Sequence, residues 1–210
     1  MRRPDLVLKC GKHLFYNHKS EAFSKLGNNV WDYYEHLLRA AADLNNITVA
    51  QECLVSLQGQ FGESLRVKRL EGLLMEAQNQ FETALQIYDD ILKDHPTDAL
   101  SYKRKVAIFR SQNLIEESIT ALNEYLKIYQ NDLEAYEELA DIYLANAEYK
   151  NALFCIEEMI LSNPANYIFH LKYADILYTT GDYRNARKYY SQSLNINSET
   201  NMRALFGLYL

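Results

Sequence analysis

The sequence predicts an all-α fold in which pairs of antiparallel helices stack side by side into a right-handed superhelix, an α-solenoid. Three observations carry this prediction. A small residue returns every 34 positions, a large apolar or aromatic residue follows it four positions later, and a turn-forming residue recurs five positions before it. A fixed period of this length is typical of one helical unit stacked on copies of itself.

Each pair of small and large residues marks the contact between the two helices of one repeat. The small residues are Ala50, Ala84, Ser118, Ala152 and Ala186. The large residues that follow them are Leu54, Tyr88, Leu122, Ile156 and Tyr190. Because residues four apart share a helix face, the small one lets two helices approach closely and the large one fills the space beneath. This pattern at this period is that of the tetratricopeptide repeat.

The period divides most of the chain into repeats. We predict a degenerate first repeat at 31–64 and four tetratricopeptide repeats over 65–200, at 65–98, 99–132, 133–166 and 167–200. Two repeats place Pro96 and Pro164 where the second helix should end, and proline stops a helix. The third repeat has Gln130 there, yet its second helix is still expected over about 116–128.

The turn between the two helices of a repeat needs a residue with left-handed backbone. Four repeats fill this position with Asn45, Asn79, Asn113 and Gly181. Asn and Gly tolerate that conformation better than other residues. The fourth of the five repeats has Ala147 instead, so its neighbour Asn146 is expected to take over the role.

Two segments lie outside the repeats. Residues 1–30 are predicted to form an N-terminal helical cap, because an end repeat otherwise exposes its stacking face. The apolar positions of this cap are Leu6, Leu14, Phe15, Ala22, Phe23 and Leu26. Residues 201–210 are predicted to begin a further helix that is cut short and leaves apolar side chains uncovered.

Charge and hydropathy exclude several classes of protein. A net charge of −6 argues against nucleic acid as the main ligand. No apolar stretch approaches the roughly 18 residues of a membrane span. The apolar run that Lys9 interrupts is too short for a secretory signal, so the sequon at Asn46 is expected to be unused.

The three cysteines are an odd number without paired spacing. Cys53 and Cys155 occupy the same position of their repeats, on the second helix, where a small buried apolar residue is needed. We therefore expect buried, reduced thiols and a reducing compartment.

The sequence contains none of the common catalytic motifs. A glycine-rich phosphate loop, a nucleophile elbow and a zinc-binding H-E-x-x-H are all missing. His13 and His18 are five positions apart, which does not place two metal ligands on one helix face. We expect a protein that is not an enzyme and that uses no cofactor or metal.

The first helices of the repeats are expected to line a groove that binds a partner. The candidate groove residues are Arg66, Arg69, Lys103, Arg110, Glu134, Glu137, Asp141, Asp175 and Tyr178. The early half is mainly basic, and the later half is acidic with an apolar end. Such a groove suits a partner segment of complementary charge order. Two solvated helix faces that differ by chance are the alternative.

Some charged residues stand where this repeat normally buries an apolar one. Glu71 and Lys105 share such a column in adjacent repeats, so either both turn toward water or they form an ion pair between helices.

Asp141 and Asp175 occupy the column that would hold Asn in a clamp for a C-terminal carboxylate, and they would repel that ligand. The basic clusters 66–69 and 103–105 could instead contact phosphates or lipid headgroups.

Several strings are more specific than the repeat columns. They are Ser24-Lys-Leu-Gly27, Leu65-Arg-Val-Lys-Arg-Leu70, Asn123-Glu-Tyr-Leu126 and Asn201-Met-Arg-Ala-Leu-Phe-Gly-Leu-Tyr209. In these strings, from about residue 20 to the end, the chain resembles the family of ER membrane protein complex subunit 2, also described as tetratricopeptide repeat protein 35.

The resemblance implies a scaffold subunit without catalytic activity, peripheral to the membrane at the cytosolic face of the endoplasmic reticulum. The complex of such a subunit inserts tail-anchored and multipass proteins. Its partners would be cytosolic segments of the membrane subunits and a globular cytosolic subunit. A soluble peptide-binding adaptor outside any membrane complex is the alternative, and a nucleic-acid binder is a second rival.

Overall fold

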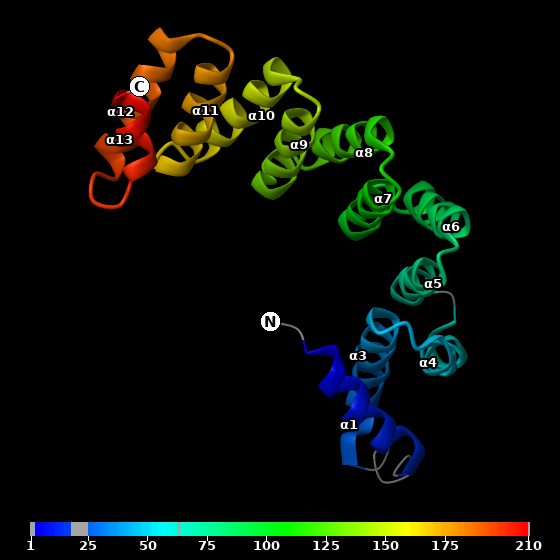
Figure 1. Ribbon diagram of the computed structural model, residues 1–210. Helices are drawn as coiled ribbons and strands as arrows, with labels where there is room; N and C mark the ends of the chain where they lie inside the picture. Colours follow the sequence, from blue (N-terminus) through cyan, green and yellow to red (C-terminus); the bar gives the residue numbers. More distant parts are fainter. Residues whose placement is uncertain (1–2, 18–24, 63, 210) are drawn as a thin grey trace. The chain divides into compact units, whose positions relative to one another are not determined.

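A computed structural model describes residues 3–17, 25–62 and 64–209 (Figure 1). Within these ranges the chain forms twelve α-helices and one short 3-10 helix, and no strand. The predicted all-α class is therefore confirmed. The helices belong to two compact units, Met1–Asn113 and Leu114–Leu210.

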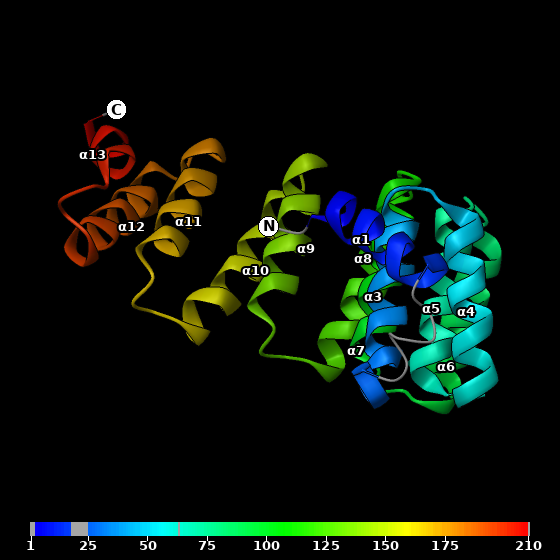
Figure 2. The ribbon, with the colours of Figure 1, turned by 90° about the horizontal axis from the view of Figure 1, so that it is seen from below.

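The first unit is built from helices that pack on their neighbours in sequence. Its elements are α1 (Pro4–Asn17), η1 (Gly27–Asn29), α3 (Val30–Asp43), α4 (Ile47–Phe61), α5 (Leu65–Ala77), α6 (Phe81–Asp94) and α7 (Ala99–Ser111). The pairs α3–α4 and α5–α6 form helical hairpins, and α5 also packs on α3 and α4 (Figure 2). Leu37, Leu38 and Cys53 are fully buried at the centre of the first hairpin.

The second unit repeats this arrangement. Its elements are α8 (Ile115–Ile128), α9 (Leu133–Ala145), α10 (Tyr149–Ser162), α11 (Tyr167–Thr179), α12 (Tyr183–Ile196) and α13 (Met202–Tyr209). The hairpins are α9–α10 and α11–α12, and α13 packs on α12. Helix α8 ends at Ile128 although Gln130 is no helix breaker. Tyr129 has already left the helical conformation, with φ −112° and ψ 65°.

The recurring small residues are among the most deeply buried positions of the second helices. Ala50, Ala84, Ser118, Ala152 and Ala186 are all at most 1% exposed. The large residues four positions later are at most 6% exposed. The predicted contact between the two helices of a repeat is therefore confirmed in the hairpins α3–α4, α5–α6, α9–α10 and α11–α12.

The turns of the hairpins follow the predicted column with one correction. The backbone is left-handed at Asn45, Asn79, Asn113 and Gly181, with φ between 54° and 85°. Ala147 itself is also left-handed, with φ 59°, whereas Asn146 keeps φ −92°. The expectation that Asn146 would take over was wrong, because the hairpin fixes the turn at one position. Glu148 N donates to Tyr143 O at 2.8 Å there, and Asp182 N makes the equivalent bond to Leu177 O at 2.9 Å.

Two glycines allow the closest helix contacts at the ends of the chain. A Cβ on Gly11 of α1 would lie 2.5 Å from Leu37 Cδ1, and Tyr33 Oη donates to the Gly11 carbonyl. A Cβ on Gly207 of α13 would lie 2.5 Å from Tyr190 Cζ. Both glycines therefore let a terminal helix sit directly on a large side chain of the adjacent hairpin.

The terminal segments expose apolar side chains. On α13, Ala204 is buried, and the exposed residues are Met202, Leu205, Phe206 and Tyr209. On α1, Leu6 and Leu14 are exposed, as is Leu26 before α3. Of the other predicted cap positions, Ala22, Phe23 and the side chain of Phe15 lie outside the described part of the chain, as does Leu210.

The cysteines follow the expectation for two of the three positions. Cys53 and Cys155 are buried free thiols on α4 and α10, whereas Cys10 on α1 is exposed. Burial raises the pKa of the Cys155 thiol to about 11. This thiol is therefore protonated and unreactive at neutral pH.

Candidate interaction site

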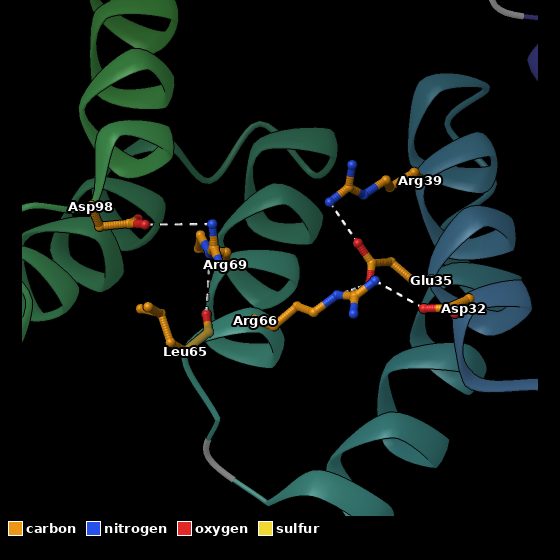
Figure 3. A network of polar contacts seen from close by, with 7 residues as sticks. All are labelled: Asp32, Glu35, Arg39, Leu65, Arg66, Arg69 and Asp98. Carbon is orange, nitrogen blue, oxygen red and sulfur yellow. Dashed lines mark hydrogen bonds and ion pairs between the residues drawn. The ribbon is translucent and has the colours of Figure 1, made fainter. Parts of the chain in front are cut away.

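The candidate residue Arg66 is held by carboxylates of the preceding repeat. Arg66 Nη2 donates to Asp32 Oδ1 at 3.0 Å, and its Nε contacts Glu35 (Figure 3). Glu35 is buried, and Arg39 Nη2 lies 2.6 Å from its Oε1. Helix α3 supplies the two acids and Arg39, and the first turn of α5 supplies Arg66. The network joins two stacked helices through one buried carboxylate.

Arg69, one turn further along α5, reaches forward along the chain. Its Nη1 lies 3.4 Å from Asp98 Oδ1, and its Nε donates to Leu65 O at 3.4 Å (Figure 3). Asp98 also caps α7, because its Oδ2 accepts from Ser101 N at 3.1 Å. Arg69 therefore connects α5 to the start of α7.

The second basic cluster, 103–105 on α7, is also paired with acids of the first unit. Arg104 Nε donates to Glu76 Oε1 at 2.9 Å, and Tyr88 Oη donates to the same oxygen at 2.7 Å. Lys105 Nζ lies 2.6 Å from Asp89 Oδ1. Lys103 and Arg110 are exposed on α7 and make polar interactions of their own.

The possible pair between Glu71 and Lys105 is not formed, since Lys105 contacts Asp89 instead. The reason is that Lys105 leans toward α6, on which Asp89 lies, and its side chain is only 14% exposed there. The alternative, in which both residues turn fully toward water, is also wrong for Lys105. Glu71 is partly exposed on α5.

In the second unit two of the acidic candidates pair with cations on other helices. Glu137 of α9 accepts from Lys172 of α11. Asp175 of α11 pairs with Arg203 of α13 at 2.8 Å and accepts from Tyr190 Oη at 2.8 Å. These contacts again join helices of neighbouring repeats.

Asp141, Glu134 and Tyr178 are exposed. The ring of Tyr178 packs edge-on against Tyr183, with centroids 5.1 Å apart. The second unit as a whole has seven Lys and Arg against fourteen Asp and Glu, a net charge of −7. Asp141 is thus an exposed acid in a strongly acidic unit.

One arrangement of three side chains occurs in both units. A carboxylate on a first helix accepts from a tyrosine of the following helix and pairs with an arginine 28 positions further along the chain. The two instances are Glu76, Tyr88 and Arg104, and Asp175, Tyr190 and Arg203. Burial first, and then the neighbouring carboxylate, raises the pKa of Tyr88 and of Tyr190 far above its usual range. These hydroxyls act as permanent donors.

The nine candidate residues are divided between the two units. The basic four lie in the first unit and the acidic and aromatic five in the second. Arg66, Arg69, Glu137 and Asp175 have ion-pair partners within their own unit. The sequence interpretation missed these partners, and above all Asp32 and Glu35. The sequence does contain a sign of such pairing, because Asp32 occupies the same position as Arg66 in the preceding repeat.

The described part of the chain offers no group of three or more His, Cys, Asp or Glu residues that could hold a metal ion. No described helix has the length and apolar character needed to cross a membrane.

The helical hairpins, their small-residue contacts and their left-handed turns define a protein of the tetratricopeptide-repeat class. A solved structure with this fold, the C-terminal part of a TPR repeat-containing protein from Cytophaga hutchinsonii, has a TM-score of 0.66 to this chain. It is 19% identical, and the superposition covers 93% of this chain and 78% of that one. The predicted tetratricopeptide α-solenoid fold is confirmed.

Residues 63–196 match the family model described as EMC2 TPR-like repeat domain. The chain belongs to this family. ER membrane protein complex subunit 2 of Xenopus tropicalis is 44% identical over 107 residues, which are 51% of this chain and 35% of the relative. The protein of the same name in Dictyostelium discoideum is 40% identical over 112 residues, 52% of this chain and 34% of the relative. The matched stretch thus spans about a third of each relative's length.

Proposed function

We propose that the chain acts as a scaffold subunit of the ER membrane protein complex, at the cytosolic face of the endoplasmic reticulum membrane. It would support the insertion of tail-anchored and multipass proteins by holding other subunits in place. Its partners would be cytosolic segments of the membrane subunits and a globular cytosolic subunit. The observation that carries this proposal is the family match over 63–196.

The arrangement of side chains supports a binding role without catalysis. Four of the charged candidates are paired through contacts between helices, such as Arg66 with Asp32, and such contacts shape a surface. Stacked helical hairpins present extended surfaces of this kind to partner proteins. The uneven charge of the chain, concentrated as −7 in the second unit, favours partners with basic segments.

Co-purification tests the proposal. The full 210-residue chain, tagged and expressed in cells, is recovered from detergent-solubilised endoplasmic reticulum membranes, and the bound proteins are quantified. We expect subunits of the ER membrane protein complex in fixed stoichiometry with the chain. Recovery only as a free monomer in the soluble fraction would contradict the proposal and favour the soluble adaptor.

A variant with a disturbed repeat provides the control. Ala152 is fully buried between α9 and α10, and a bulky side chain there disrupts the stacking. Ala152→Leu should reduce the recovery of partners together with the folded fraction of the chain. Proteins that still co-purify with an unfolded variant are non-specific.

A further inference from the structure

A groove with a volume of about 530 Å³ lies in the second unit, between α8 and α10. Helix α9 forms its floor, because it packs on both of these helices and lies between them (Figure 1). The lining residues of α10 recur every three or four positions, so they share one face of that helix. They include Asn151, Phe154, Glu158 and Ser162. We call this feature the α8–α10 groove.

The dimensions of the groove favour an extended chain over a helix. Its α10 wall runs from Asn151 to Ser162, which is about 16 Å of helix. A volume of about 530 Å³ over that length leaves a mean cross-section of about 33 Å², whereas a helix about 10 Å across needs about 80 Å². An extended chain is narrower, and about five of its residues span the same length.

Two side chains of opposite charge line the groove on opposite walls. Lys127 comes from α8 and Glu158 from α10. Among the described residues, neither of them has an ion-pair or hydrogen-bond partner. Glu137 and Asp175 of the same unit, by contrast, are paired with cations. An occupant of the groove can therefore pair with both charges without breaking an existing contact.

The neutral polar side chains of the groove suit a peptide main chain. Asn123, Gln130 and Asn131 carry carboxamides, which donate and accept hydrogen bonds as a peptide group does. Within the described chain, none of these carboxamides is hydrogen-bonded. On the floor, burial and then the Glu158 carboxylate raise the pKa of Tyr136, so its hydroxyl remains a donor. An extended segment brings unpaired N–H and C=O groups to such side chains.

The two walls specify the order of charges in an occupant. Consecutive side chains of an extended segment point to opposite sides. An acidic residue next to a basic residue therefore reaches Lys127 with one side chain and Glu158 with the other. Two adjacent bases would place one of them beside Lys127, and two adjacent acids would place one beside Glu158. The groove thus selects a pair of unlike charges, although its own two charges cancel.

We propose that the α8–α10 groove binds an extended segment of a partner protein in which an acidic and a basic residue are adjacent. The acid pairs with Lys127 and the base with Glu158, while an apolar side chain of the segment covers Phe154, which is 57% exposed. This inference goes beyond the proposed function, because none of the nine candidate residues lines this groove.

Fluorescently labelled peptides test the proposal on the full 210-residue protein. The probes are four short peptides with the same neutral, Thr-rich flanks, which favour extended backbone. They carry Asp-Lys, Lys-Asp, Lys-Lys or Ser-Ser at the centre. We expect a saturable rise in anisotropy with at least one of the two mixed peptides. Lys-Lys and Ser-Ser should bind at least about fivefold more weakly, since an exposed ion pair contributes up to about that factor.

A charge reversal on one wall should change which peptide is preferred. Lys127→Glu leaves two acids in the groove, so the Lys-Lys peptide should bind at least about fivefold more tightly than either mixed peptide. Lys188→Glu is the control, because Lys188 is exposed on α12 of the same unit and does not line the groove. It changes the net charge equally and should leave the mixed peptides preferred.

A milder variant covers the case in which Lys127→Glu fails to fold. Lys127→Gln adds no acid beside Glu124, which lies one turn earlier on α8. It should bind the mixed and Lys-Lys peptides with affinities within about twofold of each other. Circular dichroism establishes which variants are folded.

The proposal fails on any of three results. One is the lack of a saturable anisotropy change with both mixed peptides. Another is binding of Lys-Lys or Ser-Ser to the parent as tight as that of the mixed peptides. The third is a change of preference in Lys188→Glu equal to that in Lys127→Glu. Co-purification with a membrane complex is measured separately, so failure of the peptide assay leaves the proposed function standing.

Discussion

Arg66 and Asp32 are 34 positions apart in sequence, one full repeat, and their side chains meet at 3.0 Å. The same period that places small residues at the hairpin contacts thus places opposite charges on successive first helices. Equivalent positions of stacked repeats are neighbours in space. Opposite charges at equivalent positions of successive repeats are therefore candidates for ion pairs.

Replacing Glu35 should destabilise the first unit. Its buried carboxylate binds both Arg39 and Arg66, and Glu35→Gln removes the charge while keeping the shape. We expect a loss of about 1–2 kcal/mol in the free energy of unfolding, limited because both guanidiniums can reach water. Urea unfolding measures it. Asp90→Asn, in an exposed pair, should change stability by less than about 0.5 kcal/mol.

Overpacking the small-residue column should destabilise the second unit. Ala152 is 0% exposed at the contact of α9 and α10, so Ala152→Leu should cost about 1–3 kcal/mol. Ala145→Leu, an exposed position at the end of α9, serves as the control and should stay within about 0.5 kcal/mol of the parent. Equal effects in the two variants would show that the column is not a tight contact.

Relieving the left-handed alanine should stabilise the protein. Ala147 has φ 59°, which costs about 1–2 kcal/mol for a residue with a Cβ. Ala147→Gly should raise the free energy of unfolding by about 0.5 kcal/mol, after the added freedom of glycine in the unfolded chain is counted. Gly181→Ala, at φ 85°, should change stability in the opposite direction. Thermal unfolding compares both variants with the parent.

Partner capture should depend on Asp141. This exposed acid lies on α9 in a unit of net charge −7, so Asp141→Lys should reduce capture from membrane extracts about two- to fivefold. Its thermal midpoint should match that of the parent. Reversal of Arg66 is a poorer test, because a third carboxylate beside Asp32 and Glu35 would also destabilise the fold. Undiminished capture by Asp141→Lys would remove this surface from the candidates.

Alkaline pH should weaken the second unit through Cys155. Burial raises the pKa of this thiol from 9.0 to about 11, so the unfolded chain releases the proton first. The free energy of unfolding should therefore fall as pH rises from about 9 to 11. Urea titrations at pH 8 and 10.5 measure the loss, which should be smaller in Cys155→Ala. At pH 8 the exposed thiol of Cys10 should react with a disulfide reagent well before Cys155.

The fold could be predicted from the sequence because its determinants repeat. Ala84 and Tyr88 follow the column, and so does the turn at Asn79. Even Ala147, a poor residue for a left-handed turn, adopts the conformation that its position requires. The hairpin geometry outweighs a local penalty of about 1–2 kcal/mol.

The candidate site could be predicted only in part. The charges of Arg66 and Glu137 are evident in the sequence, yet whether each side chain faces a partner protein or an adjacent repeat of its own unit depends on side-chain reach. Lys105 illustrates the limit. The repeat column suggests Glu71 as its partner, whereas its aliphatic chain carries the ammonium to Asp89 on α6. Comparing equivalent positions of the repeats finds contacts between equivalent helices. It misses contacts between a first helix and a second helix.

The ion pairs between different repeats affect how cooperatively the repeats unfold. Asp32–Arg66, Glu76–Arg104, Glu137–Lys172 and Asp175–Arg203 all connect one repeat to the next. In a one-dimensional description of a repeat protein, they strengthen the coupling between adjacent units and leave the intrinsic stability of each hairpin almost unchanged. Ionic strength then tunes cooperativity: as salt screens these pairs, the unfolding transition should broaden before its midpoint moves far.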